Sequence, residues 1–66
     1  MTPTMLRQFW SLVENTQASF ILNQDDSSLV NWLIAQMNRH GVENLDDVDA
    51  YVRSRTTLIR DIVAAR

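Results

Sequence analysis

Apolar residues recur every three or four positions over the first third of the chain, which predicts an amphipathic helix over residues 3–22. We expect Thr2, or else Thr4, to cap it and Pro3 to occupy its first turn, where a missing N–H costs nothing. The apolar side chains cover about half of the helix circumference at about 100° per residue. They form one seam, Leu6, Phe9, Val13, Thr16 and Phe20, with Trp10, Gln17 and Ile21 in a second row beside it. Two rows predict two contact surfaces on this helix.

A polar run over residues 23–28 interrupts the periodicity and predicts a short connection, with an N-cap at Asp25, Asp26 or Ser27. A second helix is expected over residues 27–39. Its apolar stripe is Leu29, Val30, Leu33, Ile34 and Met37, and Trp32 falls at the edge of this stripe or outside it.

Gly41, the only glycine, predicts the end of the second helix, because it adopts the left-handed backbone conformation at low cost. Val42 and Met37 then form the apolar pair of a Schellman motif. Asn44 is expected to cap a third helix over residues 45–65, with Asp47 three positions on in an arrangement like a capping box. The side chains expected to point inward from this helix are Leu45, Val48, Val52, Ile59, Ile62 and Val63, flanked by Tyr51 and Leu58. The fold class predicted is an all-α, antiparallel three-helix bundle in one domain, residues 1–66.

The small size of the chain predicts that association with another chain completes its core. A single core in 66 residues leaves about 3–5 kcal/mol of net stability, and the chain has no Cys for a disulfide. Because 45% of the residues are hydrophobic, we expect a homodimer that uses the apolar face of the first helix. The residues expected at the interface are Leu6, Phe9, Trp10, Val13, Phe20, Ile21, Trp32 and Arg55. The alternative for Trp10 is a place in the chain's own core, with its indole N–H hydrogen-bonded within the chain.

All six basic residues are Arg, a side chain favoured over Lys in partly buried ion pairs and interfaces. Arg55 stands out because a helical wheel places it near the middle of the third helix's apolar stripe. Its stem can extend to water, its head can pair with Glu14 or stack on Trp10 or Trp32, or it can contact another chain.

The sequence carries no pattern typical of catalysis, of a cofactor site, of a metal site or of a small-molecule substrate site. His40 precedes Gly41 near a helix C-terminus, where a cationic imidazole is favoured, and no nucleophile stands at a suitable spacing. The acidic pairs and triplets begin helices and lack the glycine and distal Glu of a calcium loop. We therefore expect a non-enzymatic interaction or regulatory protein.

A helix-turn-helix protein that binds nucleic acid through the Arg-rich C-terminal half of the third helix is the alternative. The net charge of −2 and the acidic start of that helix, Asp46, Asp47 and Asp49, oppose it. No apolar run is long enough to span a bilayer, and the N-terminus lacks the pattern of a signal peptide, so we expect a cytoplasmic protein with no membrane partner.

Three stretches resemble a group of small uncharacterised helical proteins from cyanobacteria. They are RQFWSLVENTQA (residues 7–18), DDSSLVNWLIAQM (residues 25–37) and YVRSRTTLIRDIVAAR (residues 51–66). The resemblance implies a cyanobacterial cytoplasm and a regulatory or assembly-related protein. It implies no activity for any particular residue.

Overall fold

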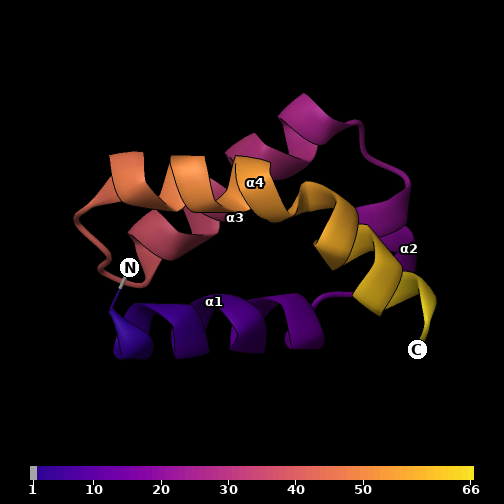
Figure 1. The fold of residues 1–66 in the computed structure, drawn as a ribbon, viewed down its shortest axis with the longest axis horizontal. Helices are drawn as coiled ribbons and strands as arrows, with labels where there is room; N and C mark the ends of the chain where they lie inside the picture. Colours follow the sequence, from indigo (N-terminus) through magenta and orange to yellow (C-terminus); the bar gives the residue numbers. More distant parts are fainter. Residues whose placement is uncertain (1) are drawn as a thin grey trace.

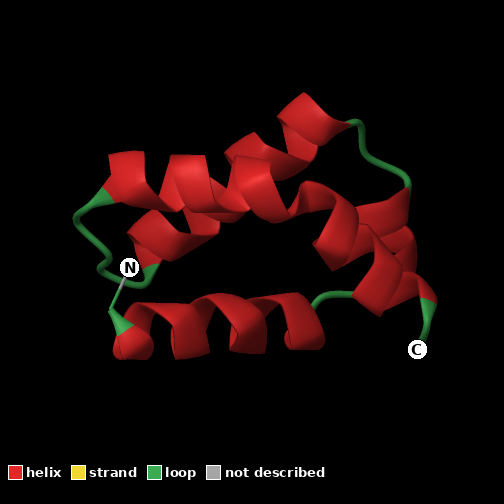
Figure 2. Ribbon diagram, in the orientation of Figure 1, coloured by secondary structure: helices red, strands yellow, loops and turns green. Residues whose placement is uncertain are grey.

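The computed structural model describes residues 2–66, which form four helices and no strand (Figures 1 and 2). The helices are α1 (Pro3–Asn15), α2 (Ala18–Leu22), α3 (Asp26–Arg39) and α4 (Leu45–Ala64). This confirms the all-α class. The bounds of α3 and α4 lie within one residue of the helices predicted over residues 27–39 and 45–65.

The long helix α4 is the element on which the others assemble. It packs most extensively against α3, next against the short α2, and least against α1. Figure 1 shows α1 and α4 running in the same direction, with α3 running the opposite way and α2 beside the C-terminal half of α4. Apolar side chains from all four helices and from the turn before α4 therefore meet in one core.

The prediction of one helix over residues 3–22 is wrong, because α1 ends at Asn15 and the backbone of Thr16 and Gln17 is extended. The Thr16 hydroxyl donates to the Leu12 carbonyl oxygen at 2.7 Å, and its N–H donates to the Val13 carbonyl oxygen at 3.2 Å. These bonds satisfy the carbonyl groups at the end of α1. The described chain therefore has four helices instead of the three predicted. The rotation of α2 about its own axis is independent of that of α1.

The Schellman motif predicted at the end of α3 is present. Gly41 has a φ of +86°, the Val42 N–H donates to the Met37 carbonyl oxygen at 3.2 Å, and the Gly41 N–H donates to that of Asn38 at 3.1 Å. Met37 and Val42 are both buried, as the apolar pair of this motif requires. The turn therefore fixes the chain reversal between α3 and α4.

Asn44 precedes α4 as predicted, but the arrangement like a capping box is wrong. The Asn44 side chain makes no bond to the N–H groups of α4, and its Nδ2 donates instead to Asp47 Oδ2 at 2.6 Å. The Asp47 carboxylate is one methylene shorter than the usual Glu and accepts from the amide rather than from the backbone. The other two long helices have true side-chain caps, because Thr2 accepts from the Met5 N–H and Asp25 from the Ser28 N–H.

The core is almost entirely aliphatic. Its one buried polar side chain among residues 2–66, Thr56, donates to the Val52 carbonyl oxygen at 2.9 Å, so its hydroxyl is satisfied. The buried hydrophobic residues are Phe9, Val13, Ile21, Leu29, Val30, Leu33, Met37, Val42, Val48, Val52, Ile59 and Val63.

Candidate interaction surface

Much of the apolar face predicted to form a dimer interface lies inside the chain's own core. Phe9, Val13 and Ile21 are almost completely buried, and Leu6 and Trp10 are half-buried. The break after α1 explains why Ile21 is buried while Phe20 is 42% exposed. On a continuous helix Phe20 would continue the seam of Phe9 and Val13, but the separate rotation of α2 turns Ile21 inward in its place.

Trp10 belongs to an aromatic cluster that joins α1 to α4. Its indole N–H donates to the Tyr51 hydroxyl at 3.1 Å, which agrees with the interpretation of Trp10 as a residue bonded within the chain. The Phe9 ring meets Trp10 and Tyr51 edge to face at 5.1 and 5.6 Å between centroids, a favoured aromatic geometry. Packing between α1 and α4 is otherwise sparse, so this cluster provides an important contact between the two helices.

Arg55 lies on the solvent side of this cluster rather than in the middle of the apolar stripe. Its guanidinium carbon is 5.2 Å from the centroid of the Tyr51 ring, and its Nη1 donates to the Ser54 hydroxyl at 3.2 Å. The predicted partners Glu14, Trp10 and Trp32 are therefore not the groups that it contacts. The expectation that Ile62 points inward is also wrong, because Ile62 is exposed, so the true centre of the stripe is rotated away from Arg55.

Trp32 is half-buried and packs on α2 through an edge-to-face contact with Phe20, with the ring centroids 4.9 Å apart. Phe20 is otherwise open to solvent. The pair forms a small aromatic patch where α2 meets α3, and Leu22 of α2 is also exposed, at 40%.

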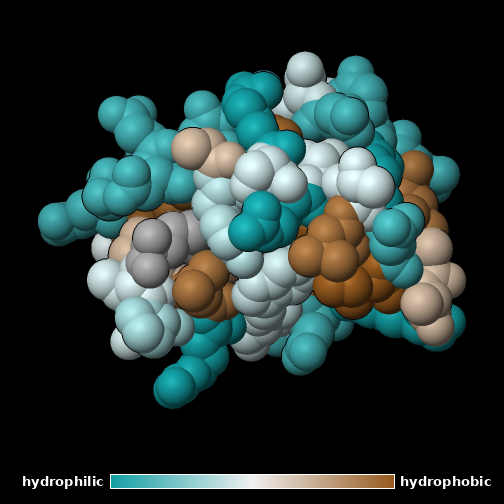
Figure 3. All heavy atoms as spheres, in the orientation of Figure 1, coloured by the Kyte–Doolittle hydropathy of each residue, from teal (hydrophilic) through white to brown (hydrophobic). Residues whose placement is uncertain are grey.

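A second group of exposed apolar side chains lies on α4. Leu58 and Ile62, one helical turn apart, are 44% and 42% exposed. Tyr51 lies two turns before Leu58 on the same face, since positions i, i+4 and i+7 of a helix align. Figure 3 shows hydrophobic side chains gathered over the C-terminal half of α4. We call Tyr51, Leu58 and Ile62 the α4 stripe.

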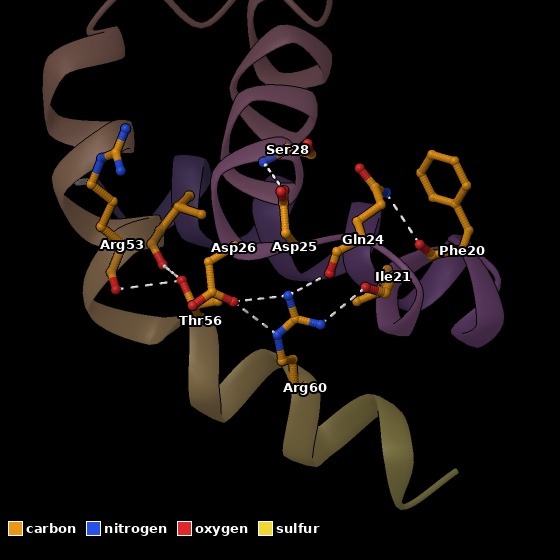
Figure 4. Close-up of polar contacts among 10 residues, drawn as sticks. Phe20, Ile21, Gln24, Asp25, Asp26, Ser28, Arg53, Thr56 and Arg60 are labelled. Atoms are coloured by element: carbon orange, nitrogen blue, oxygen red, sulfur yellow. Dashed lines mark hydrogen bonds and ion pairs between the residues drawn. The ribbon is translucent and has the colours of Figure 1, made fainter.

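Arg60 joins the C-terminal half of α4 to the connection between α2 and α3 (Figure 4). Its Nη2 donates to the Gln24 carbonyl oxygen at 2.7 Å and to Asp26 Oδ1 at 2.8 Å, and its Nη1 donates to the Ile21 carbonyl oxygen at 3.4 Å. A planar fork with several N–H groups can satisfy the free carbonyls at a helix end and a carboxylate at the same time. No pattern in the sequence predicts this role for Arg60.

Arg66 donates hydrogen bonds to the free carbonyl groups at the end of α1. Its two Nη atoms donate to the carbonyl oxygens of Val13 and Thr16 at 2.6 and 2.9 Å. No spacing in the sequence indicates either role, because the acceptors are distant along the chain: 34–39 residues away for Arg60 and 50–53 for Arg66. Only the excess of Arg over Lys pointed in this direction.

The arginines of α4 and its C-terminus are engaged within the chain. Arg53 pairs with Asp49 at 2.6 Å, Arg55 covers Tyr51, and Arg60 and Arg66 bind carbonyl groups. Phosphate groups would have to compete with these contacts, and the acidic residues at the start of α4 would repel them. These contacts therefore do not favour the alternative that the C-terminal half of α4 binds nucleic acid.

Asp25 is the residue whose ionisation is most clearly tied to the fold. Hydrogen bonds from the Ser28 side chain and then from the Ser28 N–H lower the pKa of the Asp25 carboxyl below its ordinary value, with a smaller contribution from the charge of Arg60. These bonds favour the ionised form, which also suits the N-terminus of α3.

A shallow hollow of about 490 Å³ lies between α1 and the C-terminus of α3, lined by Arg7, Gln8, Ser11, Leu12, Asn15 and His40. Ser11 and His40 both reach it, but within residues 2–66 no carboxylate accompanies them in its lining. The lining therefore lacks the carboxylate that orients the base in a Ser-His-Asp triad.

Over residues 2–66, no helix combines the length and apolar character needed to cross a membrane, and no three His, Cys, Asp or Glu side chains gather as metal ligands would. No family model matches the chain, and no curated protein or solved structure shows significant similarity to it.

Proposed function

We propose that this chain is a non-enzymatic protein–protein interaction module that forms a homodimer, and that the α4 stripe is its contact surface. The observation that carries the proposal is the exposure of two large aliphatic side chains, Leu58 and Ile62, one turn apart on the longest helix. Each side chain withdrawn from water contributes about 25 cal/mol per Å² of apolar area.

The proposal changes which part of the chain is expected to meet the partner. Phe9, Val13 and Ile21 are already withdrawn from solvent and offer a second copy almost no further area to bury. Leu58 and Ile62 retain that area. In a symmetric dimer the same patch is used on both copies, so one exposed stripe supplies both halves of the contact.

The small size of the core supports association. Only twelve hydrophobic residues form the buried core of residues 2–66, and a chain of this length gains only a few kcal/mol of net stability from folding alone, about 3–5. Burial of the α4 stripe against a second copy would add to this stability by mass action. We place the dimer in the cytoplasm, where a protein without Cys loses nothing by the lack of disulfides.

Sedimentation equilibrium of the purified chain at several concentrations tests this proposal. We expect a reversible monomer–dimer equilibrium for the wild type, and Leu58→Glu and Ile62→Glu variants that remain monomeric because each dimer would bury two unpaired carboxylates. Far-UV circular dichroism of the variants should be unchanged, since both positions are exposed on the monomer.

Two matched variants separate the α4 stripe from other exposed positions. Thr57→Glu places the same charge on an exposed position beside Leu58 but about 100° away around α4, and Phe20→Glu places it on the other exposed apolar patch. Both should dimerise like the wild type. A wild type that stays monomeric at millimolar concentration, or a dimer that Phe20→Glu abolishes and Leu58→Glu leaves intact, contradicts the proposal.

A further inference from the structure

Two basic side chains line the hollow between α1 and the C-terminus of α3. Arg7 comes from α1 and His40 from the end of α3, and Figure 1 shows that end of α3 beside the N-terminal half of α1. Within residues 2–66 neither side chain forms an ion pair or a hydrogen bond, whereas Arg53, Arg60 and Arg66 are all bound to acceptors of the chain. The N–H groups of Arg7 and His40 are therefore available to a ligand.

Uncharged side chains of α1 complete the lining. Arg7, Ser11 and Asn15 lie on successive turns of one face, and Gln8 and Leu12 form the neighbouring row. The hydroxyl and the two amides can donate hydrogen bonds, and the half-buried Leu12 supplies an apolar surface. Among the described residues that line the hollow there is no Asp or Glu. Such a lining suits an anion and not a cation.

The two ends of the hollow differ in charge. Glu14 is exposed and adjoins Asn15, two helical turns from Arg7, so an anion at that end would be repelled. Arg7 and His40 lie at the other end. An anionic group is therefore favoured between Arg7 and His40, with the uncharged remainder of the ligand extending over Leu12.

The turn after α3 reduces the repulsion that an anion normally meets at a helix C-terminus. The last carbonyl groups of a helix carry partial negative charge when they are free. Here the N–H groups of residues 40–42 donate to the carbonyl oxygens of residues 36–38 at 3.1–3.2 Å. Arg39, exposed beside His40 but outside the lining, adds a further positive charge to this end of α3.

We propose that this hollow binds a small phosphate monoester, with the phosphate held by the Arg7 guanidinium, the His40 imidazole and the Ser11 hydroxyl. A guanidinium pairs bidentately with phosphate, whose three free oxygens can accept from donors on two different helices. The volume of about 490 Å³ lies in the range of about 300–1,000 Å³ typical of small-molecule sites, so an organic group fits beside the phosphate. The inference does not depend on the proposed dimer, because within residues 2–66 no side chain of α4 lines the hollow.

Titration of the full ¹⁵N-labelled chain with phenyl phosphate at about pH 7 tests this inference. The amide signals of residues 7–15 and 39–41 should shift saturably, with a dissociation constant of about 1 mM or below. Methyl phosphate carries the same anionic group without the ring, and we expect it to bind about fivefold more weakly because it leaves Leu12 uncovered. Phenol, which has the ring without the phosphate, should not bind.

Charge-removing variants locate the phosphate. Arg7→Gln should weaken phenyl phosphate binding about tenfold and His40→Gln about threefold. Arg7→Lys keeps the charge but not the planar fork, so its loss should be intermediate. Arg39→Gln is the matched control, because it removes the same charge beside His40 but outside the lining, and it should change the affinity less than about twofold. Circular dichroism should be the same for all four variants, since the three positions are exposed.

The outcomes are independent of the oligomeric state, which sedimentation equilibrium measures separately. Saturable shifts around the hollow that Arg7→Gln weakens and Arg39→Gln leaves intact support the site. Equal weakening by these two variants would overturn it, because it would show attraction to net charge alone. The absence of saturable shifts up to about 10 mM phenyl phosphate, or shifts centred on other residues, would also overturn it. Equal affinity for methyl and phenyl phosphate would overturn the placement of the organic group over Leu12.

Discussion

Gly41 shows how one residue type can specify a turn. Its φ of +86° lies in the region that L-residues with a Cβ avoid, yet a Cβ built on Gly41 would meet no atom within 4 Å. Substitution by Ala should therefore cost only the backbone strain, about 1–2 kcal/mol of the free energy of unfolding. Urea denaturation of Gly41→Ala and Gly41→Asn measures this, and Asn, which tolerates the left-handed region better, should lose less. Equal stability of wild type and Gly41→Ala would contradict the strain argument.

Asp25 gives the fold a dependence on acidic pH. Because its pKa is lower in the folded chain than the ordinary value of 3.8, the ionised carboxylate stabilises the fold at any pH above that value. This contribution is lost as the pH falls through the lower pKa of the folded state. The Asp25→Asn variant keeps a capping acceptor but does not titrate, so its thermal midpoint should fall less steeply than that of the wild type between about pH 4.5 and 2. Identical slopes would mean that Asp25 does not contribute.

Residues whose partners are near in sequence were the ones that could be predicted. Gly41 and the pair of Met37 and Val42 follow from local backbone geometry, and so does the cap at Thr2. The partners of Arg60 and Arg66 are backbone carbonyls and, for Arg60, the Asp26 carboxylate, all more than 30 residues away, and no spacing in the sequence encodes them. A helical wheel marks Arg55 as unusual but does not give its aromatic partner Tyr51, because an apolar stripe that includes the exposed Ile62 misplaces the centre of the buried face of α4.

At the scale of elements, α3 and α4 were predictable because each has a clear apolar period and a marked boundary. The break between α1 and α2 was not, because it contains neither Gly nor Pro and the period continues through Thr16 to Phe20. Two side chains stabilise the break. The Thr16 hydroxyl donates to the Leu12 carbonyl oxygen, and Arg66 donates to the carbonyl oxygens of Val13 and Thr16. Asn15 and Thr16 are weak helix formers, which is the one local signal of the break in the sequence.

Arg60 should be the arginine that matters most for holding α2 and α3 against α4. Its side chain is only 25% exposed and donates to two carbonyls and Asp26, so Arg60→Ala should lower the free energy of unfolding by about 1–3 kcal/mol. Arg60→Lys should recover little, since an ammonium cannot reproduce the planar fork.

Arg53 is the matched control, because its side chain is 57% exposed and it forms a single ion pair with Asp49 on the same helix. Arg53→Ala should cost no more than about 0.5 kcal/mol. Chemical denaturation of the three variants at one low concentration measures folding apart from association. Equal losses for Arg53→Ala and Arg60→Ala would show that the contacts of Arg60 do not hold the elements together.

At the scale of the whole molecule, the apolar side chains are divided between the core and the surface differently from the prediction. The first helical segment supplies Phe9, Val13 and Ile21 to the core, while exposed aliphatic side chains lie on α4, at Leu58 and Ile62, and at the end of α2, at Leu22. Hydrophobic periodicity shows that a helix has an apolar face, but it does not show which of several apolar faces are paired within the chain. That assignment depends on how α1, α2 and α3 share the circumference of α4.

Association should also appear in the thermal stability of the whole chain. If the folded dimer and unfolded monomers are in equilibrium, the thermal midpoint of the wild type rises with protein concentration, whereas that of Leu58→Glu does not. Circular dichroism melts at about 5 and 500 µM make this comparison. A wild-type midpoint that is independent of concentration would contradict coupled folding and association.

The most direct measurement is a dilution series followed by the amide signals of the uniformly ¹⁵N-labelled chain. Because the α4 stripe is proposed to be the surface buried in the dimer, the signals that move between millimolar and micromolar concentration should cluster around Tyr51, Leu58 and Ile62 and leave the Phe20–Trp32 patch unchanged. Signals that move only on the outer face of α1, or signals that do not move at all, would contradict the account.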